Sequence, residues 1–209
     1  MPRTRQPLIG VYWGRFNPPH SGHLRMIRRF RKACRLTVAI GGSEHRDERR
    51  DPFSGRERKA MMEAYLKELG FRDVRVVALR DGPSATWSVR NLMRRCTPDL
   101  LFLSTERSDL NRVARRYVKV VSFRRTGRIS STRIRDSIAA DDGGWRGLTG
   151  RSVARLIVGF GGVSRIKAAY GGASRRVRPG SSMRRPWTGA RTRTPRPTRT
   201  SVKGRRAFR

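Results

Sequence analysis

Acidic residues are scarce in this chain of 209 residues, which has 15 Asp and Glu against 50 Lys and Arg and a formal net charge of +35. A charge of this size is typical of proteins that neutralise the phosphates of nucleic acids. The excess is nearly all Arg, however, and a high-GC coding bias would produce the same composition. Charge alone therefore leaves open whether the surface binds a polyanion.

Cysteine and long apolar runs are also nearly absent. Cys34 and Cys96 lie far apart and show no CxxC or Cys/His ligand spacing, so neither a disulfide framework nor a structural zinc site is expected. The apolar part of the opening MPRTRQPLIGVYWG is too short for a signal peptide or a membrane span. We expect no membrane partner and a reducing, cytoplasmic location.

Short β-rich segments alternate with segments of helical periodicity along most of the chain. This alternation predicts an α/β fold, a Rossmann-like parallel sheet of about five strands with helices on both faces and closing C-terminal helices. Ser54 and Glu57 form the pattern of a capping box, and Ser130, Ser131 and Thr132 are good helix-start residues. The expected strands are 8–13, 36–41, 73–79, 99–103 and 117–123, and the expected helices are 20–34, 54–70, 86–95, one from 130 and one at 149–159.

The length suits one α/β domain with an appendage. We expect a catalytic domain over residues 1–170. Residues 171–209 contain no Asp or Glu and are rich in Arg, Pro, Gly, Ser and Thr. Such a segment buries too little apolar surface to offset the entropy of ordering, so it is predicted to be a disordered basic tail.

The string GRFNPPHSGH at residues 14–23 combines a strand-ending glycine, a proline-stiffened loop and two histidines three residues apart. His20 and His23 would point the same way beside a helix N-terminus, whose N–H groups favour an anion. A metal pair or a pair of surface histidines is the alternative explanation for an isolated HxxH. Two of the three histidines of the chain fall in this loop, which favours a polyphosphate site.

A second string, ISSTRIR at residues 129–135, follows the last expected strand. The two strings together resemble the nucleotidyltransferase superfamily, whose signature is GxFxPxHxGH followed by ISSTxxR. The resemblance implies that His20 and His23 are catalytic and stabilise charge at the α-phosphate of ATP. It assigns further ATP contacts to Gly14, Phe16, Ser130, Ser131, Thr132 and Arg135. Arg15 and Arg50 are added to these contacts by the more specific similarity that follows.

Within that superfamily, RDPFSGRER at 50–58 and the segment 145–167 are similar to the archaeal-type nicotinamide-nucleotide adenylyltransferases. By this similarity, Trp87 occupies the position where those enzymes have an aromatic residue near the nicotinamide ring. An indole and a cationic pyridinium attract each other by about 0.5–2 kcal/mol. A core position is an equally good explanation of Trp87. The chain has Ser104-Thr105-Glu106 where the archaeal enzymes have Ser-Gly-Asn, and ISST in place of Ser-Gly-Thr.

The resemblance implies transfer of AMP from ATP to nicotinamide mononucleotide, with Mg²⁺ accompanying ATP and a homo-oligomeric assembly. Nicotinic acid mononucleotide, pantetheine phosphate or FMN are alternative acceptors for the same chemistry. A different hypothesis makes the chain a nucleic-acid-binding protein that works through its basic tail, and that binding would depend strongly on salt.

Overall fold

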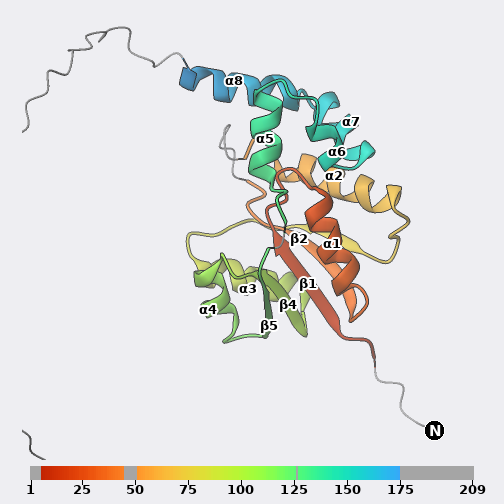
Figure 1. Cartoon of the computed structure of the whole chain (residues 1–209). Helices are drawn as coiled ribbons and strands as arrows, with labels where there is room; N and C mark the ends of the chain where they lie inside the picture. Colours follow the sequence, from red (N-terminus) through yellow and green to blue (C-terminus); the bar gives the residue numbers. More distant parts are fainter. Residues whose placement is uncertain (1–5, 45–50, 126, 175–209) are drawn as a thin grey trace, which may run out of the picture. The chain divides into compact units, whose positions relative to one another are not determined.

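The computed structural model describes residues 6–44, 51–125 and 127–174 (Figure 1). Along the chain, strands alternate with helices up to β5, and helices follow from there. The strands are β1 (Ile9–Gly14), β2 (Arg35–Ile40), β3 (Arg75–Ala78), β4 (Leu100–Ser104) and β5 (Lys119–Phe123). The helices are α1 (Ser21–Phe30), α2 (Gly55–Glu68), α3 (Ala85–Cys96), α4 (Ser108–Ala114), α5 (Ser131–Ala139), α6 (Trp145–Leu148), α7 (Arg151–Gly159) and α8 (Gly162–Ser174).

The five strands form one sheet in the order β3-β2-β1-β4-β5, and every pair of neighbours is parallel. The chain moves outward from β1 to β3, then returns to the other side of β1 for β4. The strand order therefore reverses between β1 and β4, and open α/β sheets bind ligands in the crevice at such a point. This topology confirms the predicted fold class.

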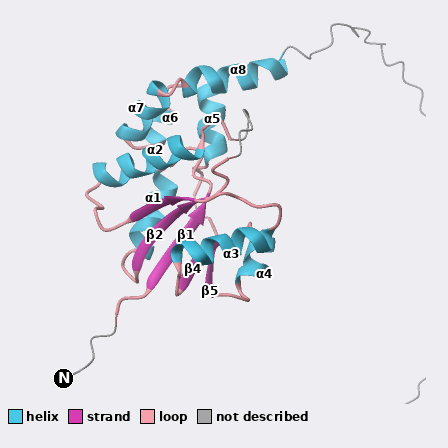
Figure 2. Cartoon of the chain, turned by 180° about the vertical axis from the view of Figure 1, so that it is seen from behind, coloured by secondary structure: helices cyan, strands magenta, loops and turns pink. Residues whose placement is uncertain are grey.

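Helices cover both faces of the sheet, with α1 and α2 on one side and α3 and α4 on the other (Figure 2). On the first face, Ile27 and Phe30 of α1 and Met62 of α2 pack against Tyr12 and Val38 of the sheet. The opposite face has its own core, formed by Val11, Trp13, Ala39, Leu79, Val89, Leu92, Leu101, Leu103 and Ala114. Burial on both faces explains why the strands read as continuous apolar runs.

A third core lies beyond the sheet, where α5 to α8 pack together and against α2 (Figure 1). Ile134 and Ile138 of α5 and Ile157 of α7 are buried there with Phe53. The N-terminus of α7 is fixed by Glu68, whose carboxylate accepts hydrogen bonds from the backbone N–H groups of Arg151 and Ser152. The closing helices are therefore attached to the domain through α2.

Several boundaries differ from the expected ones. The helix after the first loop ends at Phe30 and not near residue 34, since the chain turns there to start β2. The short helices α4 and α6 were not predicted, and neither was α8, which extends four residues past the expected boundary at 170. The capping box of α2 is confirmed, with the Ser54 side chain accepting from Glu57 and the Glu57 side chain accepting from Ser54.

Both cysteines are free thiols, and burial raises the pKa of each. Within the described ranges, no group of three or more metal-binding side chains occurs. The described helices are all too short or too polar to cross a membrane.

Candidate active site

The first loop leaves the sheet at Gly14 in a conformation that the glycine makes possible. Phe16 has a positive φ of 51° and is buried, so its ring folds back over the end of β1. A Cβ atom on Gly14 would lie 2.9 Å from the Phe16 ring, closer than side chains tolerate. The Gly-Arg-Phe sequence thus produces a tight reversal that directs the following residues across the ends of the strands.

His20 and His23 meet at the start of α1. His20 is the N-cap residue, and its Nδ1 accepts a hydrogen bond of 3.1 Å from the Gly22 backbone N–H. The His23 Nδ1 accepts one of 3.2 Å from the His20 backbone N–H. The two rings stack with their centroids 3.6 Å apart. A Cβ atom on Gly22 would lie 2.9 Å from the His20 ring, so the small residue of the motif lets the rings approach.

This geometry corrects one expectation, because the Gly22 N–H is already bonded to His20 and is not free to bind an anion. The hydrogen-bond donors that His20 and His23 can present to an anion are instead their imidazole N–H groups. Burial, with a smaller contribution from Arg125, lowers the pKa of His20 to about 3. Burial also lowers the pKa of His23, with further contributions from His20 and Arg125. Both rings are therefore neutral, and because each Nδ1 is an acceptor, the proton of each lies on Nε2.

The second motif lies directly against the first. Ser130 is the N-cap of α5 and accepts from the Arg133 N–H, as expected for a helix start. Ser131 Oγ donates a 2.9 Å hydrogen bond to the carbonyl oxygen of Pro18, and Arg135 Nη1 donates one of 2.7 Å to that of Asn17. Two side chains of α5 therefore hold the backbone of the histidine loop from 113 and 118 residues away.

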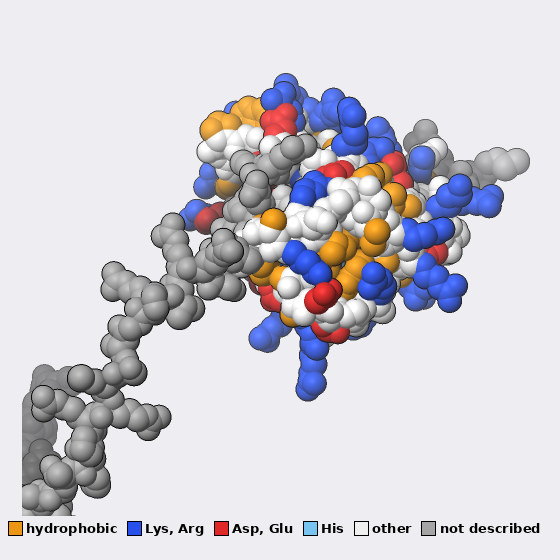
Figure 3. All heavy atoms as spheres, turned by 90° about the horizontal axis from the view of Figure 1, so that it is seen from above, with side chains coloured by type: hydrophobic (Ala, Val, Ile, Leu, Met, Phe, Trp, Pro, Cys, Tyr) orange, Lys and Arg blue, Asp and Glu red, His pale blue; other side chains and the backbone are white. Residues whose placement is uncertain are grey.

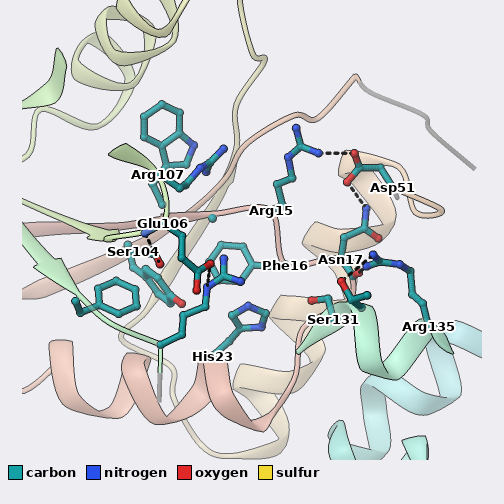
Figure 4. A pocket seen from close by; sticks show the side chains of 16 residues that line it. Arg15, Phe16, Asn17, His23, Asp51, Ser104, Glu106, Arg107, Ser131 and Arg135 are labelled. Atoms are coloured by element: carbon teal, nitrogen blue, oxygen red, sulfur yellow. Dashed lines mark hydrogen bonds and ion pairs between the residues drawn. The ribbon is translucent and has the colours of Figure 1, made fainter. Parts of the chain in front are cut away.

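A cavity of about 440 Å³ opens at the carboxyl ends of β1 and β4, where the strand order reverses (Figure 4). Both motifs contribute to its wall. It is lined by Tyr12, Trp13, Gly14, Arg15, Phe16, Asn17, His23, Asp51, Ser104, Glu106, Arg107, Phe123, Arg125, Ser131, Thr132 and Arg135. Four arginines against two carboxylates make this wall suited to an anion.

One carboxylate organises the Arg15 side of the cavity. Asp51 is buried and accepts hydrogen bonds from Arg15, at 2.6 Å, and from Asn17 Nδ2, at 3.1 Å (Figure 4). Arg135 Nε and Asn17 Oδ1 are buried and find no hydrogen-bond partner among the described residues. These groups are therefore available to a ligand that fills the cavity.

Beneath that wall lies Arg58, which is fully buried. Its guanidinium donates to the carbonyl oxygens of Phe53 at 3.0 Å, Arg15 at 2.7 Å and Gly41 at 2.8 Å, and also to that of Gly42. It forms no ion pair with a carboxylate of the described residues. A buried cation thus joins the loops that follow β1 and β2 and the start of α2.

The wall formed after β4 is also cationic. The Arg107 guanidinium lies 5.7 Å from the centre of the Trp13 ring, and burial lowers its pKa. Glu106 pairs with Arg125 at 3.3 Å, which links the loop after β4 to the loop after β5. The charge of Arg125 also acts on both histidines, as their lowered pKa values show.

Residues 11–137, which contain both motifs and the whole sheet apart from the first residues of β1, match the model of the family described as cytidylyltransferase-like. The chain belongs to this family. Its relatives include nicotinamide-nucleotide adenylyltransferases of archaea. This chain is 32% identical over 169 residues to the nicotinamide-nucleotide adenylyltransferase of Pyrobaculum neutrophilum, and the alignment covers 78% of this chain and 94% of the relative.

A second relative, the nicotinamide-nucleotide adenylyltransferase of Methanosarcina mazei, is 32% identical over 160 residues, which cover 75% of this chain and 91% of the relative. Among solved structures, a bifunctional NMN adenylyltransferase/ADP ribose pyrophosphatase from Francisella tularensis shares the fold, with a TM-score of 0.64 at 17% identity. That alignment covers 81% of this chain but only 54% of the bifunctional protein, about half its length.

Most residues expected at the site of this cytidylyltransferase-like domain lie around one cavity. Gly14, Arg15, Phe16, His23, Ser131, Thr132 and Arg135 line it. His20 stacks on His23 behind the wall, and Ser130 caps α5. Arg50 lies outside the described residues. Trp87 is half-exposed in the first turn of α3 and packs over Gly82, and it does not line the cavity.

Sequence reasoning missed several residues of the wall, among them Asn17, Asp51, Arg107 and Arg125. Asn17 lies inside the first motif and Asp51 inside RDPF, and their positions in these motifs were the available signal. Arg107 and Arg125 follow the ends of β4 and β5, and that position at a strand end was the available signal. Glu106 was noted only as a departure from the archaeal pattern.

Proposed function

We propose that this nucleotidyltransferase transfers the adenylyl group of ATP to nicotinamide mononucleotide, forming NAD and pyrophosphate. The observation that carries the proposal is the junction of the two motifs, in which Ser131 and Arg135 of α5 bond to the histidine loop at the edge of one cavity. The sequence similarity to enzymes named nicotinamide-nucleotide adenylyltransferases supports the choice of acceptor.

In this proposal the triphosphate lies in the 440 Å³ cavity. The phosphate oxygen of the mononucleotide attacks the α-phosphorus of ATP, the bond from the α-phosphorus to the bridging oxygen breaks, and pyrophosphate leaves. His23, which lines the cavity, donates from Nε2 to the charge that grows at the α-phosphate. His20 stacks on His23 from behind the wall, so in this proposal it acts with His23 by holding that ring in place. Arg15 and Arg135 neutralise the phosphates that depart, since both line the same wall.

Magnesium enters with ATP as part of the substrate. The cavity offers two carboxylates to a cation, and both already have arginine partners: Asp51 bonds to Arg15, and Glu106 pairs with Arg125. These residues do not form a metal-binding set of their own. We therefore assign the coordination of Mg²⁺ to the phosphate oxygens and water, which suits the preference of the ion for oxygen ligands.

A smaller cavity of about 250 Å³ adjoins the first and shares Trp13 and Arg107 with it. We assign this cavity to the nicotinamide end of the acceptor. Asp81 lines it and would attract a cationic pyridinium, while repelling the carboxylate of nicotinic acid mononucleotide. Trp87 packs against Gly82, which lines this cavity, and in this proposal its indole supports that wall and does not stack on the nicotinamide ring.

An acceptor screen tests the proposal directly. Pyrophosphate release is measured with ATP and Mg²⁺ against nicotinamide mononucleotide, nicotinic acid mononucleotide, pantetheine phosphate and FMN, and the first should give the highest kcat/KM. A higher kcat/KM with another compound would make that compound the acceptor, and the proposed adenylyl transfer would still stand. If no acceptor supports turnover above that of a variant combining His20→Ala and His23→Ala, adenylyl transfer itself is wrong.

A further inference from the structure

We propose that the edge of the sheet opposite the active site is a binding surface for the phosphates of nucleic acid. All strands are parallel, so they all start at one edge. Three of the five begin with an exposed cation, Arg35 in β2, Arg75 in β3 and Lys119 in β5. β3 and β5 are the outer strands, so these cations run across the full width of the sheet.

The crossover helices bring more cations to the same edge. Each of α1 to α4 connects the end of one strand to the start of the next, so its last turn lies beside the strand starts. All four helices end in basic residues, whereas α5, α7 and α8 have none in the last turn. We call this set the amino edge: Arg28, Arg29, Arg35, Lys67, Arg75, Arg94, Arg95, Arg112 and Lys119.

All nine side chains of the amino edge are exposed. Only Arg112 forms an ion pair with a described carboxylate, that of Asp109 at 3.2 Å. On the face of α5 to α8, in contrast, basic and acidic side chains are mixed (Figure 3). Two exposed carboxylates also lie at this edge: Asp73 pairs with Arg31, and Asp99 accepts a hydrogen bond from the Ile9 backbone N–H. The nine cations of the amino edge outnumber them, so this surface is strongly positive.

Helix stability does not account for this surface. A cation in the last turn of a helix interacts favourably with the macrodipole by about 0.3–1 kcal/mol. That explanation covers one cation at each helix end, yet α1 and α3 each carry two. It does not reach Arg35, Arg75 and Lys119, because strands have only small net dipoles. Clustered like charges repel one another, and a polyanion would relieve that repulsion.

The dimensions favour nucleic acid. Four strand spacings of about 4.8 Å separate β3 from β5, or roughly 19 Å, which matches the rise of five to six base pairs at about 3.4 Å each. A membrane surface is the less suitable partner, because few large apolar side chains adjoin this edge. Among the exposed ones of the described residues, only Leu8 and Tyr117 are near strand starts. The cavity lies at the carboxyl ends of the strands, so binding at the amino edge would leave it open.

The test uses the full chain in two variants that lose the same charge. One combines Arg35→Gln, Arg75→Gln and Lys119→Gln. The matched control combines Arg56→Gln, Arg146→Gln and Arg155→Gln, exposed residues of α2, α6 and α7 outside the amino edge. Binding to labelled single-stranded and duplex DNA and RNA is measured between 50 and 300 mM salt, and thermal melting and adenylyl transfer verify that both variants fold.

We expect the amino-edge variant to bind about tenfold or more weakly at roughly 100 mM salt, with a salt slope smaller by two to three, since each lost phosphate contact removes about 0.9 from the slope of a duplex. The control should bind within about threefold of the parent chain. Equal losses in both variants would overturn the proposal in favour of diffuse charge. Edge-dependent binding to phosphatidylserine vesicles without binding to nucleic acid would overturn it in favour of a membrane.

Discussion

Arg135 donates a hydrogen bond of 2.7 Å to the carbonyl oxygen of Asn17, and the same guanidinium reaches Thr132 Oγ1 at 3.3 Å. One side chain therefore fixes the histidine loop and the first turn of α5 relative to each other. The Nε of this guanidinium is still unpartnered within the described structure, so it retains a donor for a phosphate.

Arg135→Lys keeps the charge but loses the planar fork, so it should raise the KM for ATP and also lower kcat. Charge-assisted hydrogen bonds of this kind contribute about 1.5–3 kcal/mol, which corresponds to roughly 10- to 100-fold in kcat/KM. Steady-state kinetics with varied ATP measure both constants. Arg133→Lys is the matched control, since Arg133 is exposed on the same helix. Equal effects of the two substitutions would contradict this role.

His23→Ala should lower the rate of pyrophosphate release by about 100-fold or more, comparable with removing one transition-state donor. Folding should change little, because His23 lies at the surface of the cavity and its structural bond is a single one to the His20 N–H. Single-turnover measurements at saturating ATP give the rate of the chemical step. A loss of less than about tenfold would remove the case for a special role of His23.

Stability should fall as the pH falls below the ordinary pKa of histidine, about 6.5. Burial holds the pKa of His20 at about 3 in the folded protein, so between these values the unfolded chain binds the proton and the folded one does not. At pH 5 this costs on the order of 2 kcal/mol. Urea denaturation at pH 7.5 and 5 should show the loss in the parent chain and a smaller one in His20→Asn, which keeps a helix-capping side chain. An identical pH dependence in both proteins would be the contrary result.

Arg58→Met should destabilise the protein by about 3 kcal/mol or more, because four buried carbonyl groups lose their donor. Arg58→Lys should recover part of the free energy of unfolding. The KM for ATP should rise in both variants, since Arg58 holds the Arg15 backbone. Chemical denaturation and kinetics together provide the measurement. A methionine variant as stable as the parent chain would show that these bonds contribute nothing net.

Truncation after Ser174 should leave adenylyl transfer intact, because the described helices and the cavity lie before that residue. Truncation after residue 160 should destabilise the protein, since Ile166 of α8 is buried in the core with α5 and α7. Activity and melting temperature of the two truncated chains are the measurements. Loss of turnover in a folded chain ending at Ser174 would instead place part of the active site in the basic tail.

The elements that the sequence predicted well are those with a local signal. Ser54 with Glu57, and Ser130, mark helix starts by side chains that bond to their own neighbours, so the pattern is complete within four residues. α4 had no such signal, because Arg107 at its N-cap makes no side-chain capping bond and the helix has only seven residues. α8 begins after Gly161, which has a positive φ and reads as an end rather than a link between helices.

The parts of the site that could not be predicted depend on contacts across the chain. Asp51 belongs to the cavity wall through its bond to Arg15, which is 36 residues away, and no sequence spacing predicts that two such residues meet. Arg58 follows a capping box in an otherwise ordinary charged helix, where an arginine is expected to face solvent. Its burial follows from the convergence of three backbone segments, which is known only once the sheet order is known.

The bonds from α5 to the first loop also bear on how this enzyme tolerates changes in length. The hydrogen bonds of Ser131 and Arg135 hold the two motifs together in space, so the number of residues between the motifs along the chain does not set their distance. Insertions or deletions in the exposed connection between α4 and β5 would alter the periphery and leave the two motifs in register. Changes of length are therefore tolerated best in peripheral connections of this kind, away from the residues that line the cavity.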